Sequence, residues 1–297
     1  MLVFLLLVSL GVLALAFLVQ LLLTAARRRQ LRPNLEAVAL GAVTNFFDTL
    51  GIGSFAPTTA WLKLRRIVPD SFLPATLNSG HALPTIAQAL IFIHLVRVDP
   101  WLLSACIVAA VAGALLGAPL VVRLQLRFVQ AVVGIALLVA AALYAAANLL
   151  LLPAGGDALA LPWGMFALAV GVHILLGALM SFGIGLYAPS LILLSLLGLS
   201  PVAAFPIMMG ACAFLMPTCG MRFVRSERID LRVVLGLALG GIPAVLVAAY
   251  IVKSLPLDAL RWGVVVVVLY AAALLLRAAW RAGPAPVIEA ALAPPRR

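Results

Sequence analysis

Apolar stretches of 20 or more residues recur along almost the whole chain, and this feature restricts the fold more than any other. A helix rises about 1.5 Å per residue, so each stretch is long enough to cross a hydrocarbon core of about 30 Å. Only 10% of the 297 residues are charged, whereas soluble domains have about 25%. The run from Val264 to Leu276 does not alternate polar and apolar residues, which argues against a transmembrane barrel. The sequence therefore predicts an all-α polytopic membrane protein.

The charges indicate topology and not a nucleic-acid partner. The formal net charge is +11, but nearly all basic residues flank apolar segments, as topology signals do. Cys106, Cys212 and Cys219 lie inside apolar segments and predict neither a disulfide framework nor a metal site. The first apolar run, Leu2 to Ala26, precedes a cluster of arginines instead of following one, so we interpret it as a retained first helix.

An internal repeat occurs at a fixed offset of 132 residues. Most of its identities are helix-breaking residues: Gly51, Ile52, Gly53, Ala56, Pro57, Pro69 and Pro74 match Gly183, Ile184, Gly185, Ala188, Pro189, Pro201 and Pro206. With one inserted residue, Pro84-Thr85 matches Pro217-Thr218. The predicted organisation is therefore an N-terminal helix with a basic loop (1–33), repeat 1 (34–152), a linker (153–161), repeat 2 (162–282) and a disordered tail (283–297).

The basic residues also predict how the repeats are oriented, because cytoplasmic loops are enriched in Lys and Arg. If both Gly-interrupted segments cross completely, 13 basic residues lie inside and 7 outside. If both are re-entrant hairpins, 17 lie inside and three outside, namely Arg97, Lys253 and Arg261. Each repeat then has one Gly-broken hairpin and three transmembrane helices. Three is an odd number, so the repeats are inverted, as in many secondary transporters, and the C-terminus is cytoplasmic.

The two Gly-rich breaks, 51–53 and 183–185, are the strongest candidates for a binding site. Irregular backbone at membrane depth is tolerated where it is buried in protein or lines a wet cavity. A helix that restarts there offers free N–H groups and the positive end of its dipole, which bind an anion without a basic side chain. Inverted repeats bring two such ends together, so we predict an anion site formed by Gly51, Ile52, Gly53, Ser54, Gly183, Ile184 and Gly185. The alternative is that the glycines only permit close helix packing.

Four polar residues complete this predicted site: Asn78, His81, Thr85 and Thr218. The prolines before the two threonines free backbone carbonyls in mid-segment. Asn78 and His81 are candidate substrate donors, with a role in bridging two helices as the alternative. Asp48 lies three residues before Gly51, and a carboxylate at bilayer depth often handles protons. It is the proton-coupling candidate, and its alternative role is to accept from the N–H groups of the broken helix.

No strong catalytic constellation is present in the sequence. It has no H-E-x-x-H zinc motif and no G-x-S-x-G nucleophile elbow. His81, His94 and His173 are too scattered for a recognisable metal site. We therefore expect no enzyme activity, no metal and no cofactor. A membrane-embedded lipid-processing enzyme, which would depend on Asp48 and His81, stays open as a less favoured class.

The residues around the first break resemble a known family. The run from Asn45 to Ala60 (NFFDTLGIGSFAPTTA), Gly80-His81, and the run from Phe205 to Pro217 (FPIMMGACAFLMP) are similar to the sulfite exporter TauE/SafE family of membrane permeases. The resemblance covers about Asn34 to Trp280. It implies two repeats that each open with a Gly-rich break, and transport of sulfur-containing anions such as sulfite, sulfoacetate and related organosulfonates, including taurine-derived ones.

The sequence and the resemblance together predict a secondary transporter of the bacterial inner membrane that works by alternating access. Its expected partners are a small anionic substrate and the lipid bilayer, with a homodimer left open. An anion channel and a permease for a small carboxylate are the alternatives. In place of the further glycines found in the commoner family motif, this chain has Ser54 and Leu186 after its two G-I-G runs.

Overall fold

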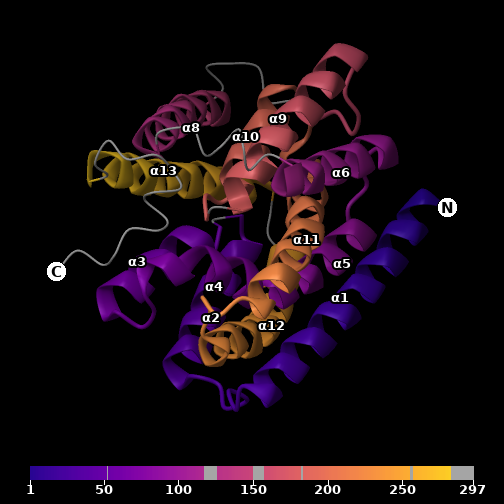
Figure 1. The fold of residues 1–297 in the computed structure, drawn as a ribbon. Helices are drawn as coiled ribbons and strands as arrows, with labels where there is room; N and C mark the ends of the chain where they lie inside the picture. The colour runs from indigo at the N-terminus through magenta and orange to yellow at the C-terminus, as the bar shows by residue number, and fades with distance from the viewer. Residues whose placement is uncertain (52, 117–125, 150–156, 182, 255–256, 282–297) are drawn as a thin grey trace.

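The computed structural model describes residues 1–297 except 52, 117–125, 150–156, 182, 255–256 and 282–297, and the described residues form helices (Figure 1). The first repeat and the helix before it contain α1 (Leu2–Arg27), α2 (Leu35–Thr49), α3 (Phe55–Arg65), a short 3-10 turn (Asp70–Phe72), α4 (Leu73–Gly80), α5 (Ala82–Leu95), α6 (Pro100–Leu116) and α8 (Leu126–Asn148). The second contains α9 (Trp163–Ser181), α10 (Tyr187–Leu196), α11 (Pro201–Arg225), α12 (Leu231–Ser254) and α13 (Leu257–Arg281).

Four described helices are long and apolar enough to cross a membrane, namely α1, α9, α11 and the Leu231–Ile251 part of α12. This supports a multi-pass membrane protein. The seven crossings expected from the sequence stay a prediction. The described part of α6 stops at Leu116, and the linker (153–161) in part and the tail (283–297) in full lie outside the described residues, as do the side chains of Arg123, Lys253 and Arg261.

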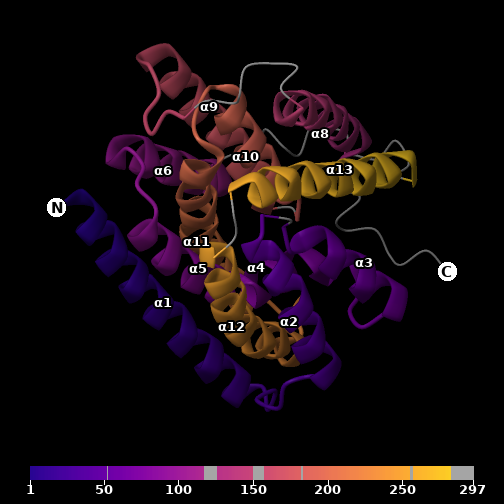
Figure 2. The ribbon, with the colours of Figure 1, turned by 180° about the vertical axis from the view of Figure 1, so that it is seen from behind.

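The helices of the two repeats pack in a reciprocal pattern. α2 packs along α12, and its counterpart α9 packs along α6, the counterpart of α12. α8 packs on its own counterpart α13, and these two lie side by side in both views (Figures 1 and 2). α4 and α5 pack on α11, which occupies the corresponding place in the second repeat. Each Gly-broken segment is therefore held by a helix of the other repeat.

Two helix pairs, α2–α12 and α6–α9, join one repeat to the other, and we call them the exchanged pairs. Glycines permit the close approach of the helices in both pairs. A Cβ on Gly41 of α2 would overlap the backbone of Leu237 in α12, and a Cβ on Gly113 of α6 would overlap the backbone of Ile174 in α9. Small residues at helix crossings bring backbones together and increase van der Waals contact, which is the main attraction between helices in lipid. Both exchanged pairs therefore have a glycine at the point of closest backbone approach. The two glycines, Gly41 and Gly113, are not repeat counterparts.

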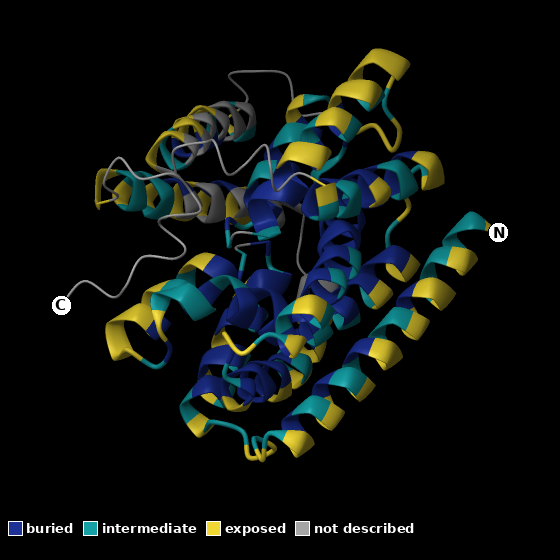
Figure 3. Cartoon of the chain, in the orientation of Figure 1, coloured by how far each residue is buried: buried dark blue, intermediate teal, exposed yellow. Residues whose placement is uncertain are grey.

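Burial is concentrated in the middle of the molecule. Figure 3 shows buried residues gathered on α2, α4 and α11, whereas α1 alternates between buried and exposed positions along its length. The buried side of α1 includes Phe17 and Leu21, and its exposed side carries large apolar residues such as Phe4 and Val12. An apolar outer surface of this kind fits contact with lipid.

The first Gly-broken segment folds back on itself. Arg65, at the end of α3, donates from Nε to Oε1 of Glu36 in the first turn of α2 at 2.8 Å, and Trp61 Nε1 donates to the same oxygen at 3.0 Å. The two ends of the hairpin α2–α3 therefore meet. They lie beside the start of α12, because the backbone N–H of Asn34 donates to the carbonyl of Arg232 at 3.0 Å.

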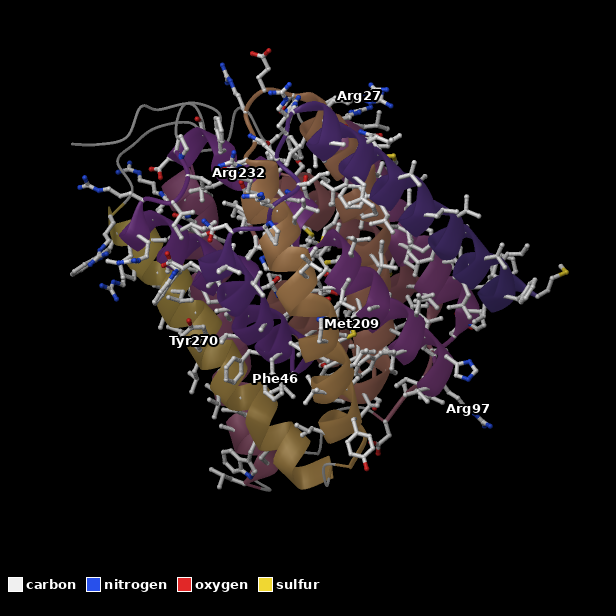
Figure 4. The ribbon with its side chains drawn as sticks, turned by 90° about the horizontal axis from the view of Figure 1, so that it is seen from below. Arg27, Phe46, Arg97, Met209, Arg232 and Tyr270 are labelled. Carbon is white, nitrogen blue, oxygen red and sulfur yellow. The ribbon has the colours of Figure 1, made fainter. Side chains whose placement is uncertain are left out.

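The second Gly-broken segment also folds back, with arms of unequal length. The N–H of Ser200, after α10, donates to the carbonyl of Ala158, before α9, at 2.8 Å. The carbonyl of the next residue, Leu159, accepts from the backbone N–H of Asp99 at 2.9 Å. This hairpin therefore opens beside the loop before α6. Figure 4 shows Arg232 toward one end of the molecule and Arg97 toward the other. The open end of the first hairpin therefore lies near Arg232, and that of the second lies near Asp99.

Candidate functional site

The tips of the two hairpins meet in the interior. A Cβ built on Gly53 would lie 3.9 Å from the Cβ of Tyr187, and one built on Gly185 would lie 3.7 Å from the Cβ of Phe55. Gly53 and Gly185 are repeat counterparts, and so are Phe55 and Tyr187. Each tip glycine thus faces the first residue of the other hairpin's second helix, which is the contact pattern of a two-fold pseudosymmetry.

Glycine is required at three of the four tip positions. The backbone φ is +96° at Gly51, +85° at Gly53 and +92° at Gly183. Residues with a Cβ rarely adopt this left-handed region, and glycine enters it without steric cost. The backbone reversal that ends α2 and α9 is therefore a direct consequence of the two G-I-G runs.

A small cavity of about 20 Å³ lies between the tips, which is enough room for a water-sized ligand. Its walls come from both hairpins, α5 and α11: Asp48, Gly53, Ser54, Phe55, Thr85, Met180, Gly185, Leu186, Tyr187 and Met216. No Lys or Arg is among these described lining residues. Of the residues that the sequence predicted for the site, five line this cavity: Asp48, Gly53, Ser54, Thr85 and Gly185.

Asp48 is buried, and both of its carboxylate oxygens accept hydrogen bonds. Oδ1 accepts from the backbone N–H of Ser54, the N-cap of α3, at 2.5 Å. Oδ2 accepts from Nε2 of Gln88 at 2.9 Å. An acid at this position interacts favourably with the positive end of α3. The counterpart of Asp48 before the second break is Met180, so α10 has no such acid.

Unlike the N-terminus of α3, the N-terminus of α10 consequently has no carboxylate beside its N–H groups. Its N-cap is Leu186, and no described side chain caps the helix. The first N–H groups of a helix have no partner within the helix and need one elsewhere. Gly185, Leu186 and Tyr187, which carry the N–H groups at this end, all line the cavity. This end of the cavity is therefore suited to a ligand that accepts hydrogen bonds.

Gln88 connects Asp48 to the second hairpin. Its Nε2 donates to Asp48 and also to Oγ1 of Thr49 at 3.0 Å, and its Oε1 accepts from the hydroxyl of Tyr187 at 2.5 Å. Sequence reasoning missed both Gln88 and Tyr187. Two signals were available. Gln88 is the one amide side chain in the mostly apolar stretch 82–95, and Tyr187 is the counterpart of Phe55 with a hydroxyl added.

His81 lies in a buried network and not at the cavity. Its Nδ1–H donates to Oδ1 of Asn45 at 3.0 Å, and its Nε2 accepts from the hydroxyl of Thr58 at 3.0 Å. In the second hairpin, Nε2 of His173 accepts from the hydroxyl of Ser190 at 2.9 Å. Thr58 and Ser190 are repeat counterparts, although the two histidines are not. The second helix of each hairpin is therefore held by a hydroxyl–imidazole bond at the same place, from His81 outside the first hairpin and from His173 within the second.

Asn78 lies next to the cavity without lining it. Its Nδ2 donates to the carbonyl of Met180 at 3.3 Å and to that of Pro74 at 2.9 Å. Its Oδ1 is buried and has no hydrogen-bond partner among the described residues. Because a buried acceptor without a partner is costly, this oxygen is suited to a water or a ligand.

The other predicted site residues lie around the cavity or apart from it. Thr218 donates to the carbonyl of Phe214 at 2.6 Å within α11 and does not line the cavity. Gly51, Gly183 and Ile184 belong to the tips but are not among the lining residues. Ile52 lies outside the described residues.

The described residues do not gather side chains for a metal. Within the described part of the chain, no three His, Cys, Asp or Glu residues lie close enough to hold an ion. The three cysteines are buried and unpaired, and Sγ of Cys212 lies 3.5 Å from Sδ of Met180. The chemistry of the cavity is therefore that of hydrogen bonding and of one carboxyl group.

Comparison with known families places this geometry in context. Residues 165–296 match the model of the sulfite exporter TauE/SafE family. The match confirms the resemblance for the second half of the chain, and it covers nearly all of the second hairpin together with α11, α12 and α13. The family is one of membrane permeases for sulfite-type anions, that is, of transporters and not of enzymes. No curated protein and no solved structure matches the chain significantly.

Proposed function

We propose that this protein is a secondary transporter of the bacterial inner membrane that moves a small sulfur-containing anion, such as sulfite or an organosulfonate, by alternating access. The observation that carries the proposal is the meeting of the two Gly-broken hairpins at a cavity lined by an uncapped helix N-terminus. Such broken helices at a repeat interface are the usual substrate sites of secondary transporters.

The membrane topology that we propose is that of inverted repeats with two re-entrant hairpins. Three observations support it: the first hairpin closes beside Arg232, the second closes beside Asp99, and Arg97 lies toward the opposite end from Arg27 and Arg232 (Figure 4). In this topology Arg97 is outside, and the cytoplasmic side carries most of the basic residues and the C-terminus.

The proposed anion site is the α10 side of the cavity, where the N–H groups of Gly185, Leu186 and Tyr187 provide the attraction. Asn78 completes it from one side, since its unpartnered Oδ1 needs a donor such as a water or a protonated ligand atom. The cavity has room for a water-sized ligand only, so a multi-atom anion requires the two tips to separate. This separation is the step that alternating access needs.

We further propose that Asp48 couples proton and anion movement. An ionised Asp48 lines the same cavity and would repel a second negative charge in a medium of low dielectric constant. Protonation of Asp48 removes this repulsion and weakens the hydrogen bond that Asp48 accepts from the N–H of Ser54. The proton and the anion would then enter the site together.

The test is flux of labelled sulfite, sulfoacetate and oxalate in proteoliposomes, with and without an imposed pH gradient. We expect saturable flux of a sulfur anion that follows the gradient, and loss of the gradient dependence in Asp48→Asn. Flux of oxalate alone would support the carboxylate permease, and flux that does not saturate would support a channel. No flux of any of the three anions would contradict the proposed function.

A further inference from the structure

The side-chain amide of Gln88 joins the acid of one hairpin to the first residue of the other hairpin's second helix. It donates from Nε2 to Oδ2 of Asp48 at 2.9 Å and accepts at Oε1 from the hydroxyl of Tyr187 at 2.5 Å. All three side chains are buried, and Asp48 and Tyr187 line the cavity while Gln88 lies behind it. The direction of both bonds follows from the fixed donor and acceptor ends of the amide.

This arrangement suits an ionised Asp48 only. A carboxylate accepts hydrogen bonds, and it meets the donor end of the amide. The backbone N–H of Ser54 occupies Oδ1, so the proton of a neutral Asp48 belongs on Oδ2. When it points at Gln88, an O–H and an N–H are aimed at each other, and two opposed donors form no hydrogen bond. A half-turn of the amide about its terminal C–C bond resolves the conflict, because Oε1 then accepts from Asp48 and Nε2 faces Tyr187.

The half-turn changes what the Tyr187 hydroxyl can do. With Nε2 facing it, the phenolic oxygen becomes an acceptor for Gln88, and its own proton needs a new partner. Thr85 and the cavity are the neighbours on that side, since Thr85 and Tyr187 both line the cavity. The donor released from Gln88 thus turns toward the place where an anion binds.

We propose that Gln88 is a positioning residue that transmits the protonation of Asp48 to Tyr187, so that an O–H donor points into the anion site only when Asp48 is protonated. This inference rests on the proposed function, because it supplies the route by which a proton prepares the site for the anion. No bond other than hydrogen bonds forms or breaks after Asp48 has taken up its proton.

We call this transmission from Asp48 through Gln88 to Tyr187 the relay. The groups around Asp48 do not add a competing charge to it. Among the described residues, the titratable side chains that interact electrostatically with Asp48 are Tyr187 from α10 and Cys212 from α11. The other hydrogen-bond partners are neutral, namely the backbone N–H of Ser54, which donates to Asp48, and the hydroxyl of Thr49, which accepts from Gln88. Thr49 donates to the carbonyl of Asn45 and accepts from Gln88, and its hydroxyl can donate to Oε1 after the half-turn.

The test is infrared difference spectroscopy of the purified full-length protein in lipid, titrated with acid and without any anion added. The bands are assigned by loss of the carboxylic C=O band in Asp48→Asn and of the tyrosine band in Tyr187→Phe. We expect both bands to change with one midpoint in the native protein. In Gln88→Met, which keeps the side-chain length, the Asp48 band should still titrate and the Tyr187 band should stay constant.

Gln20→Met is the matched control, because Gln20 donates to the carbonyl of Met221 at 2.6 Å between α1 and α11 and should leave both signals intact. Should Gln88→Met not fold, Asp48→Asn provides the second test, since its Tyr187 band should no longer respond to acid. A Tyr187 band that still follows pH in either variant would overturn the proposal. So would an Asp48 that titrates in the native protein without any Tyr187 response, or an Asp48 that does not titrate at all.

These outcomes are independent of transport, so the relay and the proposed function can fail separately. If the relay is present and no anion is carried, the transporter assignment fails alone. If anions are carried and the two bands titrate independently, the relay fails alone. Where flux is measurable, Gln88→Met should also reduce the acceleration of sulfite flux by a pH gradient by at least several-fold, while Gln20→Met should not.

Discussion

Arg65 and Glu36 lie 29 residues apart in the sequence, and their side chains hydrogen-bond at 2.8 Å across the open end of the first hairpin. An exposed ion pair of this kind contributes only about 0.2–1 kcal/mol. Its importance is geometric, because the end of α3 can reach the start of α2 only if the segment returns to the side from which it came. That relationship supports the re-entrant topology that we propose for this segment.

The first prediction concerns sidedness, tested with single cysteines at the exposed residues Arg27, Arg66 and Arg97 in a background without native cysteines. A membrane-impermeant maleimide should label Arg27→Cys and Arg66→Cys from the same side of the membrane and Arg97→Cys from the other. Inside-out and right-side-out vesicles give the two sides. Labelling of positions 27 and 97 from one side and 66 from the other would instead support nine complete crossings.

The second prediction concerns the tip glycines. Gly53→Val should abolish transport, because a β-branched residue at φ +85° is strained by about 1–3 kcal/mol and its side chain would enter the cavity. Gly185→Val lacks the backbone strain but still fills the cavity, so it should also stop flux while membrane insertion persists. Gly171→Val on the open side of α9 is the control and should transport normally. Normal flux in both tip variants would remove this site assignment.

The third prediction concerns the exchanged helix pairs. Gly113→Ala adds a Cβ that meets the backbone of Ile174, and backbone cannot move aside as a flexible side chain can. The yield of monodisperse protein in mild detergent should fall sharply. Gly11→Ala in α1, where no atom lies within 4 Å of the added Cβ, should leave the yield unchanged. Equal yields for the two variants would mean that the α6–α9 crossing is looser than described.

The fourth prediction concerns the bond between His173 and Ser190, which ties the two arms of the second hairpin together at 2.9 Å. Ser190→Ala and His173→Phe should each lower the free energy of unfolding by about 0.5–2 kcal/mol, because hydrogen bonds between membrane helices are of this size. Unfolding with SDS in mixed micelles provides the measurement. The double variant should cost less than the sum of the single ones, whereas strict additivity would show that the two side chains do not interact.

The helix breaks were predictable from the sequence because their cause is local. Gly51, Gly53 and Gly183 adopt a backbone conformation that few other residues tolerate, so a G-I-G run marks the end of a helix wherever it stands. The fixed repeat offset then predicted that two such breaks exist, and the basic residues predicted opposite orientations. The meeting of the tips is what those two predictions imply when they are combined.

The hydrogen-bond partners of the polar residues were not predictable, because they depend on distant elements. Gln88 bonds to Asp48 over 40 residues and to Tyr187 over 99, and no spacing rule connects positions so far apart. His81 was a candidate substrate donor by its depth and chemistry, but both of its nitrogens are used by Asn45 and Thr58. Sequence identifies a buried polar side chain, and only the packed structure identifies its partner.

The exchange of helices between the repeats has a consequence for biogenesis. The ribosome completes α2 about 180 residues before it reaches the start of α12, which at about 5–20 residues per second is a delay of about 9 to 36 s. During that time the face of α2 that carries Gly41 has no permanent neighbour and must be sheltered by lipid or by the insertion machinery. A chain that stops after the first repeat would keep that face uncovered, so we expect the quality-control proteases of the membrane to degrade it.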